Sequence, residues 1–382
     1  MMDMTHPFKQ QRQLFPTLGK TIHLSSCSQS AISAPVKEGV DAYLTSWNDE
    51  GMDWNGWMKK VSEAKAAFAH LINASPDEIA VLSSVSDAAS SFAGSLDFSG
   101  QRNKVVTTEI DFPCIGHVWL SQEHRGAEVV FLTEQNHQIA LDQYVEAIDG
   151  RTLVTSISHV SYYNGFIQDV KAISEIAHAN GSLLFVDAYQ SAGGVPIDVK
   201  EMGIDALASG AQKYLLGIPG IAFLYVKKEL AETLEPKTTG WFSRVNPFAF
   251  DPKTLNYAEG TLRFDTGTPM MINAYAAHAG ITLLNEIGVQ TIRPYLMELS
   301  TVAIETAQRL GLEVASPLDV TRKGSNTAIR VQNATALEQF LKTKKIVVSA
   351  RNDVLRVAPH FYNTAEEVER AIEEILHAIK HH

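Results

Sequence analysis

Short apolar runs alternate with longer amphipathic stretches between about residues 60 and 230. The apolar runs are EIAVLSS, NKVVTTE, AEVVFLT, TLVTSISHV, SLLFVDAY and IAFLYVKK. Continuous runs of this kind are typical of strands that are buried on both faces, as in a mostly parallel sheet covered by helices. Stretches such as MKKVSEAKAAFAHLI, which lie between the runs, have helical character. The alternation predicts an α/β fold.

The pattern changes after the polar stretch EPKTTGWFSRVNPFAFDPKTLNYAEGTLRFDTGTP, which contains several glycines and prolines. A long helical region follows, and then the strand candidates NTAIRVQ, KIVVSAR and VLRVAP. Thr364 with Glu367 three residues later predicts a capping box at the start of the last helix. We therefore predict a large α/β domain over residues 16–269 and a smaller α+β domain over residues 270–382. Residues 1–15 are predicted to belong to the smaller domain.

Two polar side chains are candidates for one site in the large domain. SLLFVDAY contains Asp187 near its end, and ligands of open α/β sheets bind beyond the carboxyl ends of the strands. Lys213 follows after enough chain for a helix and a strand, so both residues can return to the same sheet edge. A carboxylate that keeps a pyridine nitrogen protonated and a lysine that forms a Schiff base are the minimal equipment for pyridoxal phosphate.

The neighbours of Lys213 support this interpretation, because its stretch SGAQKYLLGIPG is small and apolar. An apolar setting lowers the pKa of a lysine, and a partly neutral amine is what a Schiff base requires. Two alternatives stay open at this point. Asp187 can be the N-cap of a helix, and Lys213 can be a lysine whose head reaches solvent from a helix end.

A phosphate site is predicted in VLSSVSDAASSFA, where a strand is followed by a helix start rich in hydroxyls. Ser83, Ser84 and Ser86 lie at this start, and Asp87 is expected near the same helix end. Backbone N–H groups at a helix N-terminus bind phosphate. Ordinary N-capping by serine is the alternative. A nicotinamide-binding protein is disfavoured, because no GxGxxG follows the first strand.

Composition restricts the partners. The formal charge of −11 argues against nucleic acid or an anionic membrane surface. The two cysteines, Cys27 and Cys114, have no metal-binding spacing, and we expect no metal. No apolar run reaches the ~18 residues of a membrane span, and the first residues lack a signal sequence. These features predict a cytoplasmic protein.

The segment VDAYQSAGGVPIDVKEMGIDALASGAQKYLLGIPGIAFLYV resembles the core of the class V aminotransferase family. TLRFDTGTP and LRVAPHFYNTAEEVERAI are also similar to family patterns, so the resemblance covers nearly the whole chain. It implies the type I pyridoxal-phosphate transferase fold of aspartate aminotransferase, a small amino acid as substrate, and a homodimer that shares its active sites. The family includes cysteine desulfurases, selenocysteine lyases and kynureninases.

The resemblance also implies roles for individual residues. Lys213 would hold pyridoxal 5′-phosphate as the internal aldimine, Asp187 would contact the pyridinium nitrogen, and Gln190 would bond the ring hydroxyl. The other implied cofactor contacts are Ser84, Val85, Ser86 and Gln212, Phe112 stacked on the ring, and Thr268 donated by the neighbouring subunit. Implied substrate contacts are Arg356, which would bind the α-carboxylate, and Ser28 and Gln29.

Alternatives remain for several of these residues. Phe112 can be a simple core residue, and Arg351 can share or take the role of Arg356. His159 follows an apolar run, and we interpret it as a packed, hydrogen-bonded histidine and not as a general base. Cys114 can lie near the cofactor, but we interpret it as a small buried structural thiol.

The chain departs from the family pattern at four places. Gln212 replaces a histidine that often precedes the lysine, Gly210 replaces a serine, and Tyr162 replaces an asparagine of desulfurases. The stretch QFLKTKKIVVSARNDVLRVAP contains no cysteine, although desulfurases carry their nucleophile there. Persulfide formation needs a thiolate, so we predict transamination first. A β-lyase of the desulfurase or selenocysteine lyase type is the alternative, and an inactive cofactor-binding scaffold is the non-enzymatic one.

Overall fold

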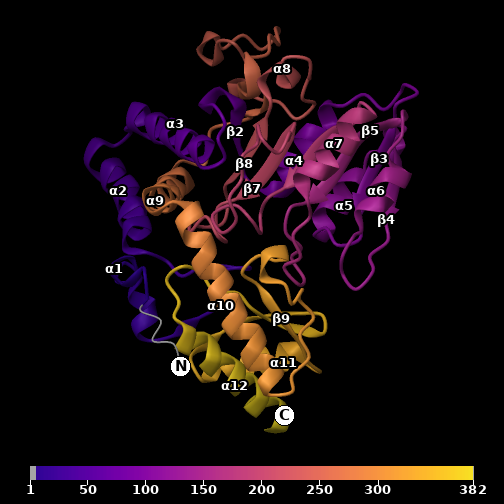
Figure 1. The fold of residues 1–382 in the computed structure, drawn as a ribbon. Coiled ribbons are helices and arrows are strands. Elements are labelled where there is room, and N and C mark those ends of the chain that lie inside the picture. The colour runs from indigo at the N-terminus through magenta and orange to yellow at the C-terminus, as the bar shows by residue number, and fades with distance from the viewer. Residues whose placement is uncertain (1–5, 382) are drawn as a thin grey trace.

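A seven-stranded sheet forms the centre of the larger part of the molecule in the computed structural model, which describes residues 6–381 (Figure 1). The strand order is β2-β8-β7-β6-β5-β3-β4. The strands from β7 to β4 are parallel, and β8 runs against both of its neighbours. The strands are β2 Ile79–Leu82, β3 Lys104–Thr108, β4 Glu128–Leu132, β5 Thr152–Ser158, β6 Leu183–Asp187, β7 Ala206–Gly210 and β8 Ala222–Val226.

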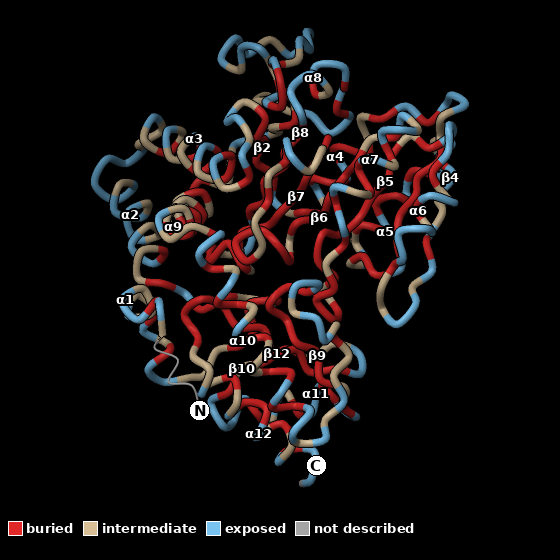
Figure 2. Tube along the Cα trace, in the orientation of Figure 1, coloured by how far each residue is buried: buried red, intermediate tan, exposed pale blue. Residues whose placement is uncertain are grey.

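All six predicted apolar runs are strands of this sheet. The seventh strand, β7, consists of small residues apart from Leu207 and is not among the predicted runs. Alternate side chains of each strand enter different cores: Leu184 and Val186 join the cluster on one face, and Phe185 joins the cluster on the other. Burial on both faces explains why the runs are continuous and not alternating. Figure 2 shows the buried strands with exposed positions on the surrounding helices and loops.

Helices cover both faces of the sheet. Residues of α4 and α5 pack on one face, and residues of α3, α6 and α7 pack on the other. The bounds of the helices up to β8 and just after it are α1 Lys9–Arg12, α2 Ala34–Glu50, α3 Trp54–Leu71, α4 Val85–Ser95, α5 Pro113–Leu120, α6 Leu141–Ala147, α7 Val170–Ala179 and α8 Lys228–Ala231. This arrangement confirms the predicted α/β architecture.

The connection from β6 to β7 differs from the expectation. We expected a helix between Asp187 and Lys213, but residues 188–205 form turns. The glycines of QSAGGVP explain this, because Gly193 adopts a φ of +95°, a conformation that other residues rarely take. A Cβ atom at Gly193 would also lie 2.2 Å from the carbonyl oxygen of Tyr214. The compact turn therefore packs directly against the lysine segment.

A smaller sheet and its helices form the C-terminal part. The antiparallel sheet has the order β11-β12-β9, and β10 pairs separately with β1 near the N-terminus. Helix α10 runs from the large sheet's side of the molecule into this part (Figure 1). The elements are β1 Ile22–His23, α9 Met271–Ile287, α10 Val289–Arg309, β9 Thr327–Arg330, α11 Ala334–Thr343, β10 Ile346–Val347, β11 Ser349–Arg351, β12 Val354–Val357 and α12 Ala365–His381.

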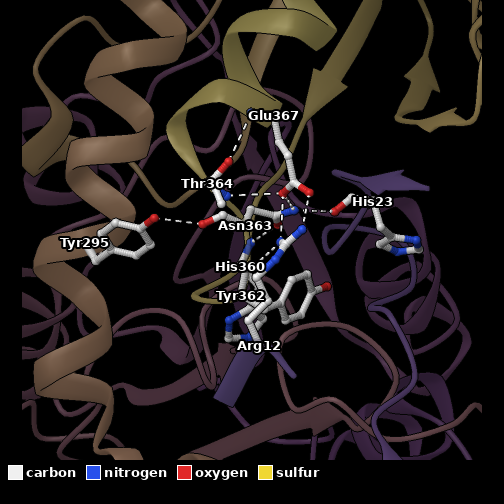
Figure 3. A network of polar contacts seen from close by, with 8 residues as sticks. All are labelled: Arg12, His23, Tyr295, His360, Tyr362, Asn363, Thr364 and Glu367. Carbon is white, nitrogen blue, oxygen red and sulfur yellow. Dashed lines mark hydrogen bonds and ion pairs between the residues drawn. The ribbon is translucent and has the colours of Figure 1, made fainter. Parts of the chain in front are cut away.

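A partly buried polar network connects the N-terminal segment to the last helix (Figure 3). The predicted capping box is present: the Thr364 N–H donates to the Glu367 carboxylate at 3.2 Å, and the Glu367 N–H donates to the Thr364 hydroxyl at 3.3 Å. The same carboxylate accepts two hydrogen bonds from the guanidinium of Arg12, at 3.0 and 2.5 Å. Paired charge-assisted bonds of this kind are strong and directional.

The proposed division into two domains stays a prediction. Helix α9, which we placed in the smaller domain, packs against α2 and α3, whereas Arg12 contacts the C-terminal part. Residues 1–5 and 382 of the predicted domains lie outside the described residues. Within residues 6–381, no helix combines the length and the apolar character that crossing a membrane requires.

Candidate active site

A cavity of about 370 Å³ lies at the carboxyl ends of the central strands. Asp187 is the last residue of β6, and Lys213 follows the end of β7 by three residues. The segment after β2 and the start of α5 complete the rim. The lining residues are Cys27, Ser28, Ser83, Ser84, Val85, Ser86, Phe112, Cys114, Ser158, Val160, Tyr162, Asp187, Tyr189, Gln190, Gln212, Lys213, Gly220, Ile221, Arg351 and Arg356. Cavities of this size accommodate small ligands.

The amine of Lys213 lies over an aromatic ring inside this cavity. Its Nζ atom is 4.0 Å from the ring centre of Tyr189 and 5.6 Å from that of Phe112. Burial lowers the pKa of Lys213 to about 8, although the charge of Asp187 opposes this change. The guanidinium groups of Arg356 and Arg351 lower the pKa further. A large share of the amine is therefore neutral near pH 8, as a nucleophilic lysine requires.

Asp187 provides a buried carboxylate in the same cavity. The side chain is 5% exposed, and its Oδ1 atom accepts a hydrogen bond from the Tyr189 N–H at 2.9 Å. Burial raises its pKa to about 6, and the positive charge of Lys213 works against this rise. Asp187 is consequently ionised at neutral pH and can hold a proton on a basic ring nitrogen placed beside it.

A second buried carboxylate, Asp111, was missed by the sequence reasoning. It accepts hydrogen bonds at 2.6 Å from both the N–H and the hydroxyl of Ser158, and one at 2.9 Å from the hydroxyl of Thr107. These contacts join the ends of β3 and β5. The charge of Asp111 contributes to the raised pKa of Asp187. Because Asp111 lies in a short loop after β3, nothing in its local sequence distinguished it from a turn aspartate.

The N-terminus of α4 faces the cavity and suits an anion. Ser84 is the N-cap, and its hydroxyl accepts from the Asp87 N–H at 3.1 Å. The carboxylate of Asp87 accepts hydrogen bonds from the hydroxyls of Ser83 and Ser84. An anion at this helix end would therefore rely on the backbone N–H groups of the first turn and on the Ser86 hydroxyl. The capping alternative and the predicted phosphate site are thus compatible.

The remaining cofactor candidates surround Lys213. Gln190 is 8% exposed and donates from its amide to the Cys27 carbonyl at 3.0 Å. The amide of Gln212 donates to the Ser28 carbonyl at 3.3 Å. The rings of Phe112 and Tyr162 meet edge to face with centres 5.1 Å apart. Phe112 therefore lines the cavity and is not a core residue away from it.

Arg356 provides a buried positive charge in the cavity wall. It is only 1% exposed, and it donates to the Tyr162 carbonyl at 2.8 Å and to the Ser28 hydroxyl at 3.0 Å. Arg351 lines the same cavity. A buried guanidinium whose hydrogen-bond partners are neutral favours an anionic ligand that completes its pairing.

Two predicted site residues lie outside this lining. Thr268 lines a separate cavity together with Lys65 and Asp265. The side-chain amide of Gln29 donates to the carbonyls of Ser30 and Gly217, both at 3.4 Å. The structure of one chain therefore brings together the predicted residues except these two.

His159 is a buried residue outside the Lys213 cavity. Its side chain is 3% exposed and lines another cavity, together with Tyr144 and Gln168. Burial lowers its pKa to about 4, so the imidazole is neutral. Its backbone N–H donates to the Asp187 carbonyl at 2.9 Å. The interpretation as a packed histidine agrees with this placement.

Tyr189 is the main lining residue that the sequence reasoning missed, and it explains the glycine at position 210. A Cβ atom at Gly210 would lie 2.4 Å from Cζ of Tyr189. The tyrosine ring thus occupies the space that a serine side chain would need. The bulky Tyr189 and the glycine at position 210 are therefore sterically coupled, since the ring fits only where no Cβ atom is present.

Both cysteines of the chain line the cavity. Cys27 is 1% exposed and packs with Tyr214 and Ala358. Cys114 is half-buried, and burial raises the pKa of its thiol, so it is mostly protonated at neutral pH. A protonated thiol is a poor nucleophile. Within residues 6–381, no group of three or more histidine, cysteine or acidic side chains could hold a metal ion.

The fold and the sequence together define the class of this protein. The pattern of the family "Aminotransferase class-V" matches residues 24–371, and the chain belongs to this family. The predicted family and its enzymatic character are thereby confirmed.

Particular relatives span almost the whole chain. The uncharacterized aminotransferase YcbU of Bacillus subtilis (strain 168) is 46% identical over 97% of this chain and 98% of its own. A probable cysteine desulfurase of Methanothermobacter thermautotrophicus is 27% identical over 95% of this chain and 97% of its own. The apo structure of a cysteine desulfurase from Thermococcus onnurineus NA1 superimposes with a TM-score of 0.89 over all of both chains at 24% identity. This likeness confirms the predicted fold.

Proposed function

We propose that this protein is a pyridoxal-phosphate-dependent aminotransferase that acts on a small amino acid and binds its cofactor covalently through Lys213. The observation that carries the proposal is the position of one buried, easily deprotonated amine beside one buried carboxylate, in a cavity that also receives a helix N-terminus. Solved relatives support the choice of cofactor, because a mutant of the lyase C-DES has been solved with glycine covalently linked to its PLP cofactor.

The donors around the cavity fit this cofactor. Asp187 would hold the ring nitrogen in its protonated form, and Gln190 would donate to the ring hydroxyl. The phosphate would be bound by the first turn of α4, through Val85 and Ser86, and by Gln212. Once bound, the cofactor supplies an electron sink for negative charge at the substrate's α-carbon.

The side chains of this protein would perform the remaining tasks. Arg356 would bind the α-carboxylate and orient the substrate. Lys213, when its amine is free, would accept the α-proton and return it at the acceptor carbon. A base with a pKa near 8 is suited to proton transfer in both directions near neutral pH. Phe112 and Tyr189 would exclude water from the reacting atoms.

Transamination is favoured over sulfur transfer by the hairpin that carries Arg356. Arg351 of β11 pairs with Val354 of β12, so only Asn352 and Asp353 connect the strands. This two-residue turn contains no cysteine and leaves no loop that could bring one to the cavity. The β-lyase remains the second candidate, because the Cys114 thiol lines the cavity and several relatives are named as probable cysteine desulfurases.

One experiment separates these reactions. The purified protein is incubated with a panel of amino acids while pyridoxamine phosphate, alanine, sulfide and selenide are measured. Formation of pyridoxamine phosphate by wild-type protein, and its loss in Lys213→Ala, supports the transaminase. Release of sulfide or selenide overturns it in favour of the lyase. A wild-type protein that shows the cofactor absorption band but forms none of these products would instead be an inactive cofactor-binding scaffold.

We further propose a homodimer in which the partner supplies Thr268. Thr268 lies outside the Lys213 cavity within one chain, and Val245, Phe248 and Phe250 of the preceding segment are all more than half exposed. Mixing inactive Lys213→Ala chains with Thr268→Ala chains tests the arrangement. Mixed dimers would carry one intact site and regain activity. Activity that stays absent on mixing, or a monomer in light scattering, contradicts it.

A further inference from the structure

Two arginines of one hairpin line the Lys213 cavity. Arg356 of β12 pairs with Ser349 of β11, and Arg351 lies two residues beyond Ser349 on the same strand. Side chains two residues apart on a strand point to the same face. The two arginines are therefore diagonal neighbours, which lie about 7 to 8 Å apart in antiparallel pairs.

Neither guanidinium is neutralised within the described residues. The Nε atoms of Arg351 and Arg356 are both buried without a hydrogen-bond partner there. Arg356 donates its hydrogen bonds to the neutral Tyr162 carbonyl and Ser28 hydroxyl. Each arginine lowers the pKa of Lys213, which shows that their charges act on the same site. Arg356 is buried and Arg351 is half-buried. A cation that is withdrawn from water without a counterion is costly, and an anionic ligand relieves that cost.

The carboxylates near this pair have other partners. Asp187 is the one carboxylate in the lining, and it lies at the position proposed for contact with the ring nitrogen. Glu338 lines the adjoining cavity, where its Oε1 atom accepts a hydrogen bond from the Ala350 N–H at 3.1 Å. The charge of Glu338 raises the pKa of Arg351, but the two side chains form no ion pair. One α-carboxylate on Arg356 would therefore leave Arg351 without a directly bound carboxylate.

We propose that the substrate carries a second carboxylate, which Arg351 binds while Arg356 binds the α-carboxylate. The substrate class is thus an amino acid with an additional carboxylate on its side chain. This inference rests on the proposed function, because it assigns the α-carboxylate to Arg356. Arg351 also lines the adjoining cavity, so a side chain that extends away from Lys213 would pass beside it.

Equilibrium binding of unreactive acids tests the inference without requiring catalysis. Calorimetry on the holoenzyme compares the binding of succinate with that of succinamate, in which a neutral amide replaces one carboxylate. Glutarate and adipate, each compared with its own monoamide, test longer distances between the two carboxylates. A hydrogen bond to a charged group contributes enough for a preference of about 10- to 100-fold for the diacid. We expect this preference for at least one diacid in the wild-type protein.

Variants then assign the preference to its residue. Arg351→Gln should bind succinate and succinamate within about twofold of each other, and Arg356→Gln should weaken both. Arg151→Gln is the matched control, because Arg151 is exposed and lies outside the lining, and it should keep the wild-type ratio.

Two results would overturn the inference. One is a wild-type protein that binds every diacid and its monoacid within about twofold, which needs no variant to interpret. The other is a diacid preference that persists in Arg351→Gln. A protein that shows the preference but lacks the cofactor absorption band would contradict the proposed function and leave the assignment of Arg351 standing.

Discussion

Replacing Lys213 with methionine should stabilise the cofactor-free protein at neutral pH. Methionine keeps most of the side-chain volume and removes the charge. The pKa of Lys213 is about 8 in the folded protein against an ordinary value of 10.5, and one pKa unit corresponds to about 1.36 kcal/mol. The full difference is worth about 3 kcal/mol, and water that enters the cavity reduces it, so we expect about 2 to 3 kcal/mol at pH 7.

The pH dependence of this effect has a definite sign. Between pH 8 and 10.5 the unfolded chain holds a proton on Lys213 that the folded chain has lost, so the stability of the wild-type protein rises with pH in this window. The destabilisation is fully present below pH 8 and disappears above 10.5. The difference between Lys213→Met and wild type should therefore shrink to less than about 1 kcal/mol at pH 10.

Urea unfolding of both proteins, stripped of cofactor and measured at pH 7 and pH 10, provides the assay. The comparison between the proteins cancels the titration of groups that do not interact with Lys213. Asp187, which does interact with it, has a pKa of about 6 and titrates below this pH range. A Lys213→Met variant that is equally stable or less stable at pH 7, or a difference that grows towards pH 10, would refute the reasoning. Lys213 would then be charged and solvated in the folded protein.

Three further perturbations test the surrounding structure. Gly210→Ala should lower the free energy of unfolding in urea by about 1 to 3 kcal/mol, because the new Cβ atom clashes with the Tyr189 ring. The loss should vanish in a Tyr189→Ala background. Equal losses in both backgrounds would exclude this steric coupling. Lys65→Met should cost about 3 kcal/mol, because it leaves the half-buried carboxylate of Asp265, 2.5 Å from the Lys65 amine, without a counterion. A loss below about 1 kcal/mol would contradict this. Asp187→Asn should lower the pKa of Lys213 below 8, because the Asp187 charge raises that pKa. The pH dependence of reductive methylation of the cofactor-free protein measures the pKa. An unchanged or higher pKa in Asp187→Asn would contradict the prediction.

The sheet could be predicted from sequence because its central strands are buried on both faces. Such strands are continuous apolar runs, and six of the seven have this form. Strand β7 escaped prediction because all its residues except Leu207 are small, which leaves room for α4 and for the Tyr189 ring. The turn between β6 and β7 escaped prediction because its conformation depends on a close approach of Gly193 to the Tyr214 carbonyl.

The proximity of two candidate residues could be predicted, because neighbouring strand ends determine it. Asp187 ends β6 and Lys213 follows the adjacent parallel strand β7, so their proximity is a consequence of topology. Tyr189, Asp111 and Cys27 were missed because each takes its place through packing between distant segments. The placement of Arg351 and Arg356 in the cavity without a carboxylate bound to either could not be inferred from sequence. It depends on which acidic side chains lie too far away to pair with them.

The attachment point of the cofactor tests the central claim most directly. Reduction of the purified holoenzyme with borohydride, followed by proteolysis and mass spectrometry, locates any lysine that carries the cofactor. We predict a phosphopyridoxyl group on Lys213 at close to one per chain, and none in Lys213→Ala. A label on another lysine, or a wild-type protein that remains unlabelled after reconstitution with pyridoxal phosphate, would contradict this claim.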